Sequence, residues 1–418
     1  MIFRPIPEAL EDLRLPKVFL ANLILKHFFY TDIFTFHDLV GLLKIPYDFI
    51  NQLLDYLGRE KYVEILGSDP LTHSAMGLSL RYTLSNGGKR RAEQLLELDS
   101  YVGPVPVTLE DYSEQVGRQP IKFTDVTPEG MQATMQDLVI SPELIENLGV
   151  AAVNGKSLFL HGPSGNGKTA IALRLGRYWQ DAILVPYAIF VSGSVIRVFD
   201  EMTHKPLAEP SAGAEKSDPR WVYCRRPLVA AGGELSLEML DLIFNPDLNY
   251  YEAPLQLKAN NGVFLLDDFG RQCIPPQELL NRWIVPLEER QDFLSLRTGQ
   301  KFAIPFDTFI IFATNLDPAT LLDDAFLRRI RSKVKVDHVS RESYIEIFRR
   351  CCEQHGVEFK EEVVEDILVR YYDGKQRTPT GCHPRDLLEQ ILDYAHYHRI
   401  KPILNPESLE RAVRKYFL

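Results

Sequence analysis

The chain of 418 residues has few cysteines and no long apolar run. Its five cysteines form no C-x-x-C pair and no metal-ligand spacing with histidine, which argues against a disulfide scaffold or a zinc site. No apolar stretch approaches the roughly 18 residues that a membrane span requires, so we expect no membrane insertion. The first residues lack the basic region and apolar core of a secretory signal. We therefore expect a cytoplasmic protein with reduced cysteines.

The chain also lacks an excess of basic residues. It has 47 Lys and Arg against 57 Asp and Glu, a net charge of −10, which disfavours nucleic acid as the default partner. A composition of 45% hydrophobic and 25% charged residues is typical of a globular protein with a large core. The length predicts two or three domains.

One stretch fits the phosphate-loop pattern G-x-x-x-x-G-K-[ST] at every fixed position. An apolar run at 157–161 precedes it and a run of helical composition follows, as expected for a turn from a buried strand into a helix. Backbone N–H groups of such a loop face a phosphate chain, its lysine reaches the β- and γ-phosphates, and its threonine can ligate Mg²⁺. The predicted nucleoside triphosphate site comprises Gly162, Pro163, Ser164, Gly165, Asn166, Gly167, Lys168 and Thr169.

Polar side chains follow two further apolar runs. Asp267 and Asp268 end the run at 263–266, which reads as a buried parallel strand that delivers carboxylates to the ligand edge of a sheet. Asp267 would hold Mg²⁺, directly or through water, and Asp268 would polarise the attacking water as general base. Asn315 ends the run at 309–314 and can hydrogen-bond that water or the γ-phosphate if the two strands are neighbours.

The first hundred residues predict a small separate domain. Helices are expected at 17–29, 35–43 and 46–57, strands at 62–66 and 80–84, and a last helix at 89–98. This order resembles a winged-helix domain. The helix that would enter a DNA groove carries Asp48, Asp55 and Glu60 against only Arg59 and Lys61, which is poor chemistry for phosphates. A protein-docking or oligomer-contact role is favoured, with DNA binding as the alternative.

The chain also has paired arginines, Arg328 and Arg329, and a C-terminal helix that begins near 380–388 with Arg385 in its first turn. Together, these motifs resemble the AAA+ ATPase family over roughly residues 124–418. The resemblance implies one role for each matching position: Lys168 and Thr169 in Walker A, Asp267 and Asp268 in Walker B, Asn315 as first sensor, Arg328 and Arg329 at the arginine-finger position, and Arg385 as second sensor. The family usually has Glu where this chain has Asp268. The shorter side chain makes its reach to the water, and hence the rate of hydrolysis, an open question.

A predicted hairpin at 292–305, just before the Asn315 strand, resembles the AAA+ branch with MoxR-type ATPases, magnesium chelatase and enhancer-binding activators. In that branch such hairpins face a central pore. The resemblance makes Tyr250, Tyr251 and Arg297 candidate substrate contacts, while a core position for the tyrosine pair remains the alternative.

The expected fold is α/β, with a three-layer P-loop AAA+ domain, a helical lid and an N-terminal winged-helix-like domain. The expected boundaries are 1–100 for the winged-helix-like domain, 101–123 for an extended linker, 124–337 for the nucleotide-binding domain and 338–418 for the lid. An insertion near 195–228 is expected, in which 195–199 and 221–226 could pair as strands.

Arginine fingers act in trans in this family, so the resemblance implies a homo-oligomeric ring, most often a hexamer. The expected function is hydrolysis of ATP with Mg²⁺ in such a ring to remodel or assemble a protein partner that the sequence does not name. One alternative is an ATP-gated DNA-binding regulator that uses the winged helix. The other is a scaffold that binds ATP and hydrolyses little of it.

Overall fold

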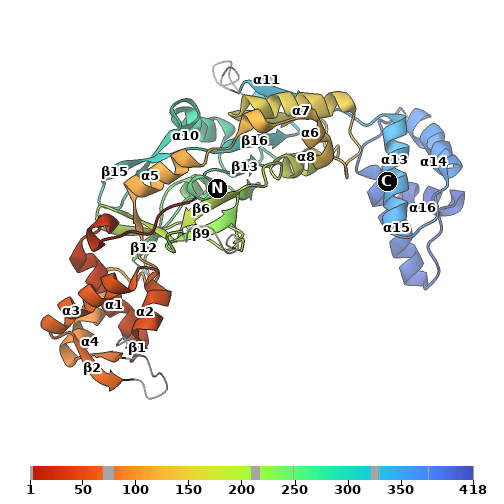
Figure 1. Ribbon diagram of the computed structural model, residues 1–418. Coiled ribbons are helices and arrows are strands. Elements are labelled where there is room, and N and C mark those ends of the chain that lie inside the picture. The colour runs from red at the N-terminus through yellow and green to blue at the C-terminus, as the bar shows by residue number, and fades with distance from the viewer. Residues whose placement is uncertain are drawn as a thin grey trace.

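The computed structural model describes residues 3–68, 80–208, 217–247, 249–321, 328, 330–374 and 376–417. A central α/β part carries a mixed N-terminal part at one end and a helical C-terminal part at the other (Figure 1). None of the helices in these ranges is long and apolar enough to cross a membrane.

The N-terminal part packs helices against a small antiparallel sheet of order β1-β3-β2. Thr35 begins α2 with a capping box: its hydroxyl accepts from the backbone N–H of Asp38, whose carboxylate accepts from the N–H of Thr35. The predicted order of helices and strands is observed, and its winged-helix interpretation remains a resemblance. The elements are η1 (Leu10–Leu13), α1 (Lys17–Tyr30), β1 (Phe34–Thr35), α2 (Phe36–Leu43), α3 (Tyr47–Arg59), β2 (Val63–Ser68), β3 (Leu80–Leu84) and α4 (Asn86–Leu98).

The segment 101–123, predicted as an extended linker, is a folded part of the molecule. It contains β4 (Val107–Thr108), α5 (Leu109–Arg118) and the turn η2 (Phe123–Asp125). Thr108 caps α5 by accepting from the N–H of Asp111, and the apolar side chains of Tyr112 and Val116, four residues apart, are buried. The linker prediction is wrong. The flanking prolines indicated an extended segment, and the amphipathic pattern of α5 is too short to have been recognised beside them.

The central sheet is parallel, with strand order β10-β13-β16-β5-β17. Its near-continuous apolar strands are buried on both faces. Phe264 and Phe312 face Trp283 of α10, whereas Leu265 and Ile311 face the helices α6, α7 and α8. This confirms the predicted three-layer α/β class. The elements are α6 (Pro128–Thr134), α7 (Pro142–Asn154), β5 (Ser157–His161), α8 (Lys168–Leu175), β10 (Leu228–Ala231), β13 (Val263–Leu266), α10 (Pro276–Glu289), β16 (Phe309–Thr314), α11 (Pro318–Leu321) and β17 (Ser332–Lys335).

A second sheet lies between the central sheet and the N-terminal part, with order β11-β12-β8-β7-β4. The predicted pairing of 195–199 with 221–226 is wrong. A tight turn at Ser192 and Gly193, both with positive φ, pairs β8 with β7 instead, and β9 pairs with β6. The elements are β6 (Ala182–Pro186), β7 (Ala188–Val191), β8 (Ser194–Arg197), β9 (Trp221–Arg225), η3 (Leu237–Leu240), β11 (Ile243–Asn245), β12 (Tyr250–Glu252) and α9 (Leu255–Lys258).

The predicted hairpin before the Asn315 strand is present as β14 (Gln291–Ser295) and β15 (Lys301–Pro305). Its tip is not free: the Arg297 guanidinium lies 4.3 Å from the ring centroid of Phe244, and its backbone N–H donates to the Tyr251 hydroxyl at 2.9 Å. Tyr250 and Tyr251 are both buried on β12. The tyrosine pair is therefore core, and its assignment as a substrate contact is wrong.

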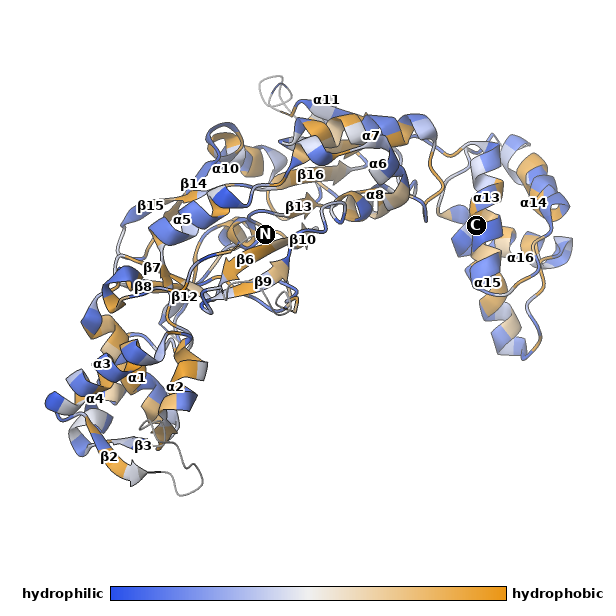
Figure 2. Ribbon diagram, viewed as in Figure 1, coloured by the Kyte–Doolittle hydropathy of each residue, from blue (hydrophilic) through white to orange (hydrophobic). Residues whose placement is uncertain are grey.

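The C-terminal part has its own apolar core, which includes Tyr344, Phe348, Leu387 and Leu409. Its helices alternate hydrophobic and hydrophilic residues in Figure 2, as expected when each buries one face. The elements are α13 (Arg341–Gln354), α14 (Glu361–Ile367), the π-helical turn η4 (Leu368–Asp373), α15 (His383–His398) and α16 (Pro406–Tyr416). We call this C-terminal part, from α13 to α16, the lid.

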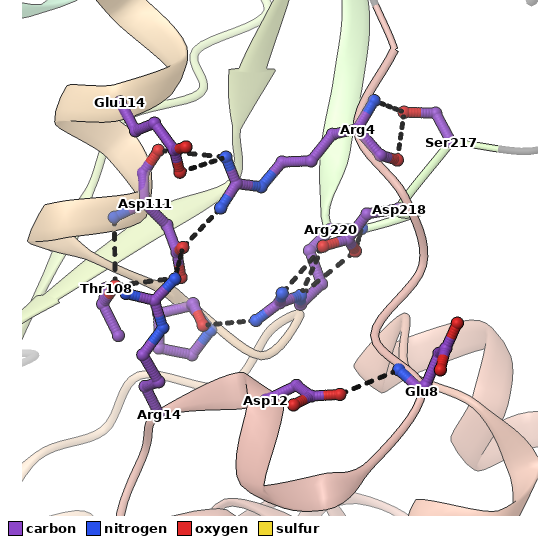
Figure 3. Close-up of polar contacts among 11 residues, drawn as sticks. Arg4, Glu8, Asp12, Arg14, Thr108, Asp111, Glu114, Ser217, Asp218 and Arg220 are labelled. Carbon is purple, nitrogen blue, oxygen red and sulfur yellow. Dashed lines mark hydrogen bonds and ion pairs between the residues drawn. The ribbon is translucent and has the colours of Figure 1, made fainter.

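The N-terminal segment starts on the central part before it enters the N-terminal part (Figure 1). The Arg4 guanidinium forms a buried ion pair with Asp111 of α5, and Asp111 also accepts from Arg14 at 2.8 Å (Figure 3). The Arg4 carbonyl accepts from the N–H of Asp218, which forms a buried ion pair with Arg220. These contacts fasten the segment to α5 and to the residues just before β9.

Candidate functional site

The phosphate loop connects β5 to α8, as its sequence predicts. Gly162 has a φ of +136°, and a Cβ there would lie 2.2 Å from the carbonyl oxygen of Val336, so only glycine fits. Lys168 Nζ donates to the carbonyl oxygens of Gly162 and Pro163, both at 2.8 Å. Burial lowers the pKa of Lys168, while Asp268 and Asp267 act in the opposite direction. The ammonium group thus lies in the loop, close to two carboxylates.

The two acids follow β13 at the carboxyl edge of the central sheet. The Thr169 hydroxyl donates to Asp267 Oδ1 at 3.0 Å, which joins the start of α8 to the end of β13. The backbone N–H of Asp268 donates to the same oxygen, also at 3.0 Å. Asp268 has a φ of +48°, which Asp tolerates better than most residues, and it is exposed toward the site. Hydroxyl and carboxylate oxygens are ligands that Mg²⁺ prefers.

Asn315 lies at the end of β16, between the strand of the phosphate loop and the acidic strand. The condition for its predicted role, that its strand adjoins the acidic one, is met. Asn315 Oδ1 is buried, and no group in the described part of the chain hydrogen-bonds to it. A buried polar atom without a partner is costly in a native fold unless a ligand or water completes it. Asn315 Oδ1 can therefore accept a hydrogen bond either from a donor group of a ligand or from an ordered water molecule.

A cavity of about 450 Å³ brings these groups together. It is lined by the phosphate loop, both acids and Asn315, by residues 137–140 and by residues of the lid. Val139 and Ile140 are apolar members of this lining. An anion-binding loop, two carboxylates and an apolar wall in one cavity are what a nucleoside triphosphate with a divalent cation requires.

Arg385 lies in the first turn of α15 and lines the cavity from the lid. Its guanidinium donates to Asp386 at 3.2 Å, and this bond is the main reason that the pKa of Arg385 is raised. The side chain is 64% exposed, so it is free to turn toward a ligand. Arg328 is exposed and does not line the cavity. Arg329 lies outside the described residues.

The sequence reasoning missed the lid contacts across the cavity. Arg350 of α13 lines the cavity and donates to the carbonyl oxygen of Gln136 at 3.1 Å. The neighbouring Asp137 pairs with Arg174 of α8 at 2.6 Å, and this hydrogen bond lowers the pKa of Asp137. Arg350 is one of many charges on an amphipathic helix, so no local pattern distinguishes it.

No group of three or more His, Cys, Asp or Glu side chains capable of holding a metal ion occurs in the described ranges. A divalent cation at this site would therefore be held jointly by Thr169, Asp267 and phosphate or water oxygens, which is the usual situation for Mg²⁺ with a nucleotide. The Thr169 hydroxyl oxygen and the Asp267 carboxylate oxygen, 3.0 Å apart, fit that requirement as metal ligands.

Residues 340–415, which span the lid helices, match the family described as Domain of unknown function (DUF8689). Comparison with curated proteins gave no significant sequence match.

Similar solved structures include NtrX from Brucella abortus in complex with ADP, with a TM-score of 0.40 at 14% identity over 66% of this chain and 55% of that one. They also include the Thermotoga maritima RuvB Holliday junction branch migration motor, with a TM-score of 0.37 at 14% identity over 66% and 69%. This chain thus covers little more than half of the NtrX chain. The function proposed below rests on the geometry of the site itself.

Proposed function

We infer that the chain is a Mg²⁺-dependent ATPase of the AAA+ type that works in an oligomeric ring to remodel or assemble a protein partner. The observation that carries the proposal is the meeting of Lys168, Thr169, Asp267 and Asn315 around one cavity, although they come from distant parts of the chain. This combination supports triphosphate binding and phosphoryl transfer to water better than binding of a simple anion.

Each residue has a distinct part in the proposed reaction. Backbone N–H groups of the loop and Lys168 bind the phosphates, and Thr169 and Asp267 are the protein groups that would hold Mg²⁺, which when bound neutralises charge on the phosphates. Asp268 accepts a proton from the attacking water, and Asn315 orients that water or the γ-phosphate. Arg385 from the lid and Arg328 or Arg329 from a neighbouring copy would stabilise charge that develops during transfer.

The test is ATP turnover by the purified protein across a concentration series, with Lys168→Ala, Arg328→Ala and Arg329→Ala alongside. We expect specific activity that rises with protein concentration because the site is completed by a neighbour. Lys168→Ala should lose nucleotide binding, whereas loss of the finger should lower turnover by about 10³-fold or more with binding retained. Activity independent of both concentration and the two arginines would contradict the ring.

A second candidate is the ATP-gated DNA-binding regulator. It is favoured by exposed basic residues at the end of α3 and the start of α4, namely Arg59, Lys61, Lys89 and Arg90. The hydroxyl of Ser85, which caps α4, donates to the carbonyl oxygen of Lys61 at 2.6 Å, so the two helix ends are close together. A parallel turnover series with duplex DNA distinguishes the two: turnover that appears only with DNA favours the regulator.

The third candidate, a scaffold with little hydrolysis, depends on Asp268. An aspartate reaches one methylene less far than the usual glutamate, so the attacking water could be poorly activated. Asp268→Glu and Asp268→Asn test this directly. If Asp268 is the general base, Asp268→Asn should lower turnover by about 10²-fold or more while ATP still binds. Equal, very slow turnover in the wild type and Asp268→Asn would favour the scaffold.

A further inference from the structure

The lid meets the phosphate loop at a very short distance. A Cβ placed on Gly165 would lie 2.6 Å from Cys382 Sγ and 2.8 Å from Thr380 Cγ2. On the lid side, a Cβ on Gly381 would lie 3.4 Å from the carbonyl oxygen of Gly165. The lid turn 380–382 therefore rests on the loop that would receive the phosphates.

The side chain of Asn166 connects the two surfaces. Its Oδ1 accepts from the backbone N–H of Gly381 in the lid at 3.0 Å. Its Nδ2 donates within the loop, to the carbonyl oxygens of Pro163 at 3.3 Å and Ser164 at 3.4 Å. The residue is only 7% exposed. A carboxamide is suited to this position because it carries an acceptor and a donor on adjacent atoms, whereas aspartate has no donor and alanine has neither.

Asn166 and Lys168 share an acceptor. The carbonyl oxygen of Pro163 receives both Lys168 Nζ at 2.8 Å and Asn166 Nδ2 at 3.3 Å. When Lys168 turns toward the phosphates of a bound nucleotide, this carbonyl loses its ammonium donor and keeps the amide of Asn166. The change at Pro163 thus acts on the same amide group whose oxygen binds the lid.

We propose that Asn166 is a positioning residue that transmits nucleotide occupancy from the phosphate loop to the lid, through Pro163 on one side and Gly381 on the other. The proposal rests on the nucleotide binding inferred above, and it goes beyond that function by assigning to one side chain the coupling between binding and lid position. Replacing Asn166 should uncouple the lid from the nucleotide more than it weakens binding, because the loop contacts phosphates through its backbone and Lys168.

Cys382 gives a direct measure of lid position. Its thiol lies against Gly165 and is only partly exposed where it lines the cavity, so lifting of the lid from the loop would make it more accessible. The full chain is treated with N-ethylmaleimide with and without saturating ADP, and mass spectrometry follows Cys382 separately from the exposed Cys273. In the wild type we expect ADP to slow alkylation of Cys382 about tenfold, since nucleotide in the cavity would hold the lid on the loop and limit local opening.

Asn166→Ala should lose this protection, to below about twofold, while its affinity for fluorescent ADP falls by no more than about tenfold, the effect of a lost hydrogen bond. If Asn166→Ala does not fold, the uncharged Asn166→Ser has a side chain too short to bond Pro163 and Gly381 together, and should lose protection likewise. Arg349→Ala is the matched control. Arg349 pairs with Glu361 inside the lid at 3.1 Å and does not line the cavity, so this variant should keep the protection by ADP.

The outcomes separate the inference from the proposed function. Full protection of Cys382 by ADP in Asn166→Ala, or no protection in the wild type despite bound ADP, overturns the coupling role alone. If the wild type binds ADP and ADP protects Cys382, but no ATP turnover is measured, the proposed hydrolysis is overturned and the coupling role is kept. Absence of ADP binding by the wild type overturns both. A lower kcat with an unchanged KM in Asn166→Ala would further support positioning, since uniform binding would then be preserved.

Discussion

The hydroxyl of Thr169 donates a hydrogen bond to Asp267 Oδ1 at 3.0 Å, and this bond joins the phosphate-loop helix to the acidic strand. Residues 98 positions apart in sequence thereby present two oxygens at one point of the cavity. A hydrogen bond of this kind contributes little to the free energy of folding, because Thr169 is exposed. Its value is chemical: the two oxygens form a protein half-site for a divalent cation.

Replacing Thr169 by Val should therefore raise the Mg²⁺ concentration that half-saturates ATP turnover by about 10 to 100-fold, the usual cost of disturbing a metal site. Thr169→Ser keeps the hydroxyl and is the matched control, with a requirement close to that of the wild type. The measurement is a Mg²⁺ titration of turnover at fixed ATP. An unchanged Mg²⁺ requirement in Thr169→Val would remove Thr169 from the metal site.

Asn315 offers a second test, because its buried Oδ1 has no hydrogen-bond partner in the described part of the chain. If this amide orients the attacking water, Asn315→Ala should lower kcat by about 10²-fold and leave KM nearly unchanged. Asn154→Ala is the control, since its amide donates to the Ser332 hydroxyl at 2.9 Å outside the cavity. A rise in KM at constant kcat would assign Asn315 to ground-state binding instead.

Local sequence patterns were sufficient to predict those parts of the fold and site whose residues are close together in the chain. The glycines and lysine of the loop, the apolar strand before Asp267 and the strand before Asn315 each lie in one continuous stretch, so the sequence predicted both the elements and the three-layer class. Such features depend on residues a few positions apart, which is the range over which sequence patterns carry information.

Contacts between distant segments could not be predicted in this way. Arg350 and Gln136 are 214 positions apart, and Asn166 and Gly381 are 215 apart, so their contacts follow from how the lid docks. Tyr250 is a strand residue whose burial depends on the second sheet, and a tyrosine pair looks the same in sequence whether it faces core or pore. The helix α5 was missed for a different reason, because the prolines around its short amphipathic pattern indicated an extended segment.

The buried ion pair between Arg4 and Asp111 predicts a stability effect far from the cavity (Figure 3). Asp111→Ala removes the buried anion of Arg4, which keeps only the half-exposed Glu114, and also removes the partner of Arg14. Breaking one partner of a buried pair typically costs about 3 to 5 kcal/mol of unfolding free energy. Glu114→Ala is the control: its carboxylate is about half exposed and lies 3.6 Å from Arg4, so it should cost under about 1 kcal/mol. Denaturant unfolding of each variant measures both values, and equal costs would contradict this account.

His204 predicts how stability depends on pH. The residue is 1% exposed, its Nδ1 accepts from the backbone N–H of Asp200 at 3.1 Å, and its Nε2 lies 2.9 Å from the carbonyl oxygen of Lys258. Nδ1 is therefore an acceptor and Nε2–H a donor, which fixes the neutral tautomer. Burial lowers the pKa of His204 to about 4, because the folded state has no place for a second ring proton.

In the unfolded chain the pKa of this imidazole returns to about 6.5. Between pH 6.5 and 4 the unfolded state binds a proton that the folded state does not, so this residue makes stability fall as the pH falls through that window. The full effect is on the order of 3 kcal/mol and is absent above pH 6.5. His204→Gln, which does not titrate, should flatten the slope of unfolding free energy against pH in this range, while replacement of the exposed His396 by Gln should leave it unchanged. Denaturant unfolding at several pH values between 4 and 7 provides the comparison, and parallel slopes for His204→Gln and the wild type would show that His204 binds its proton equally well in both states.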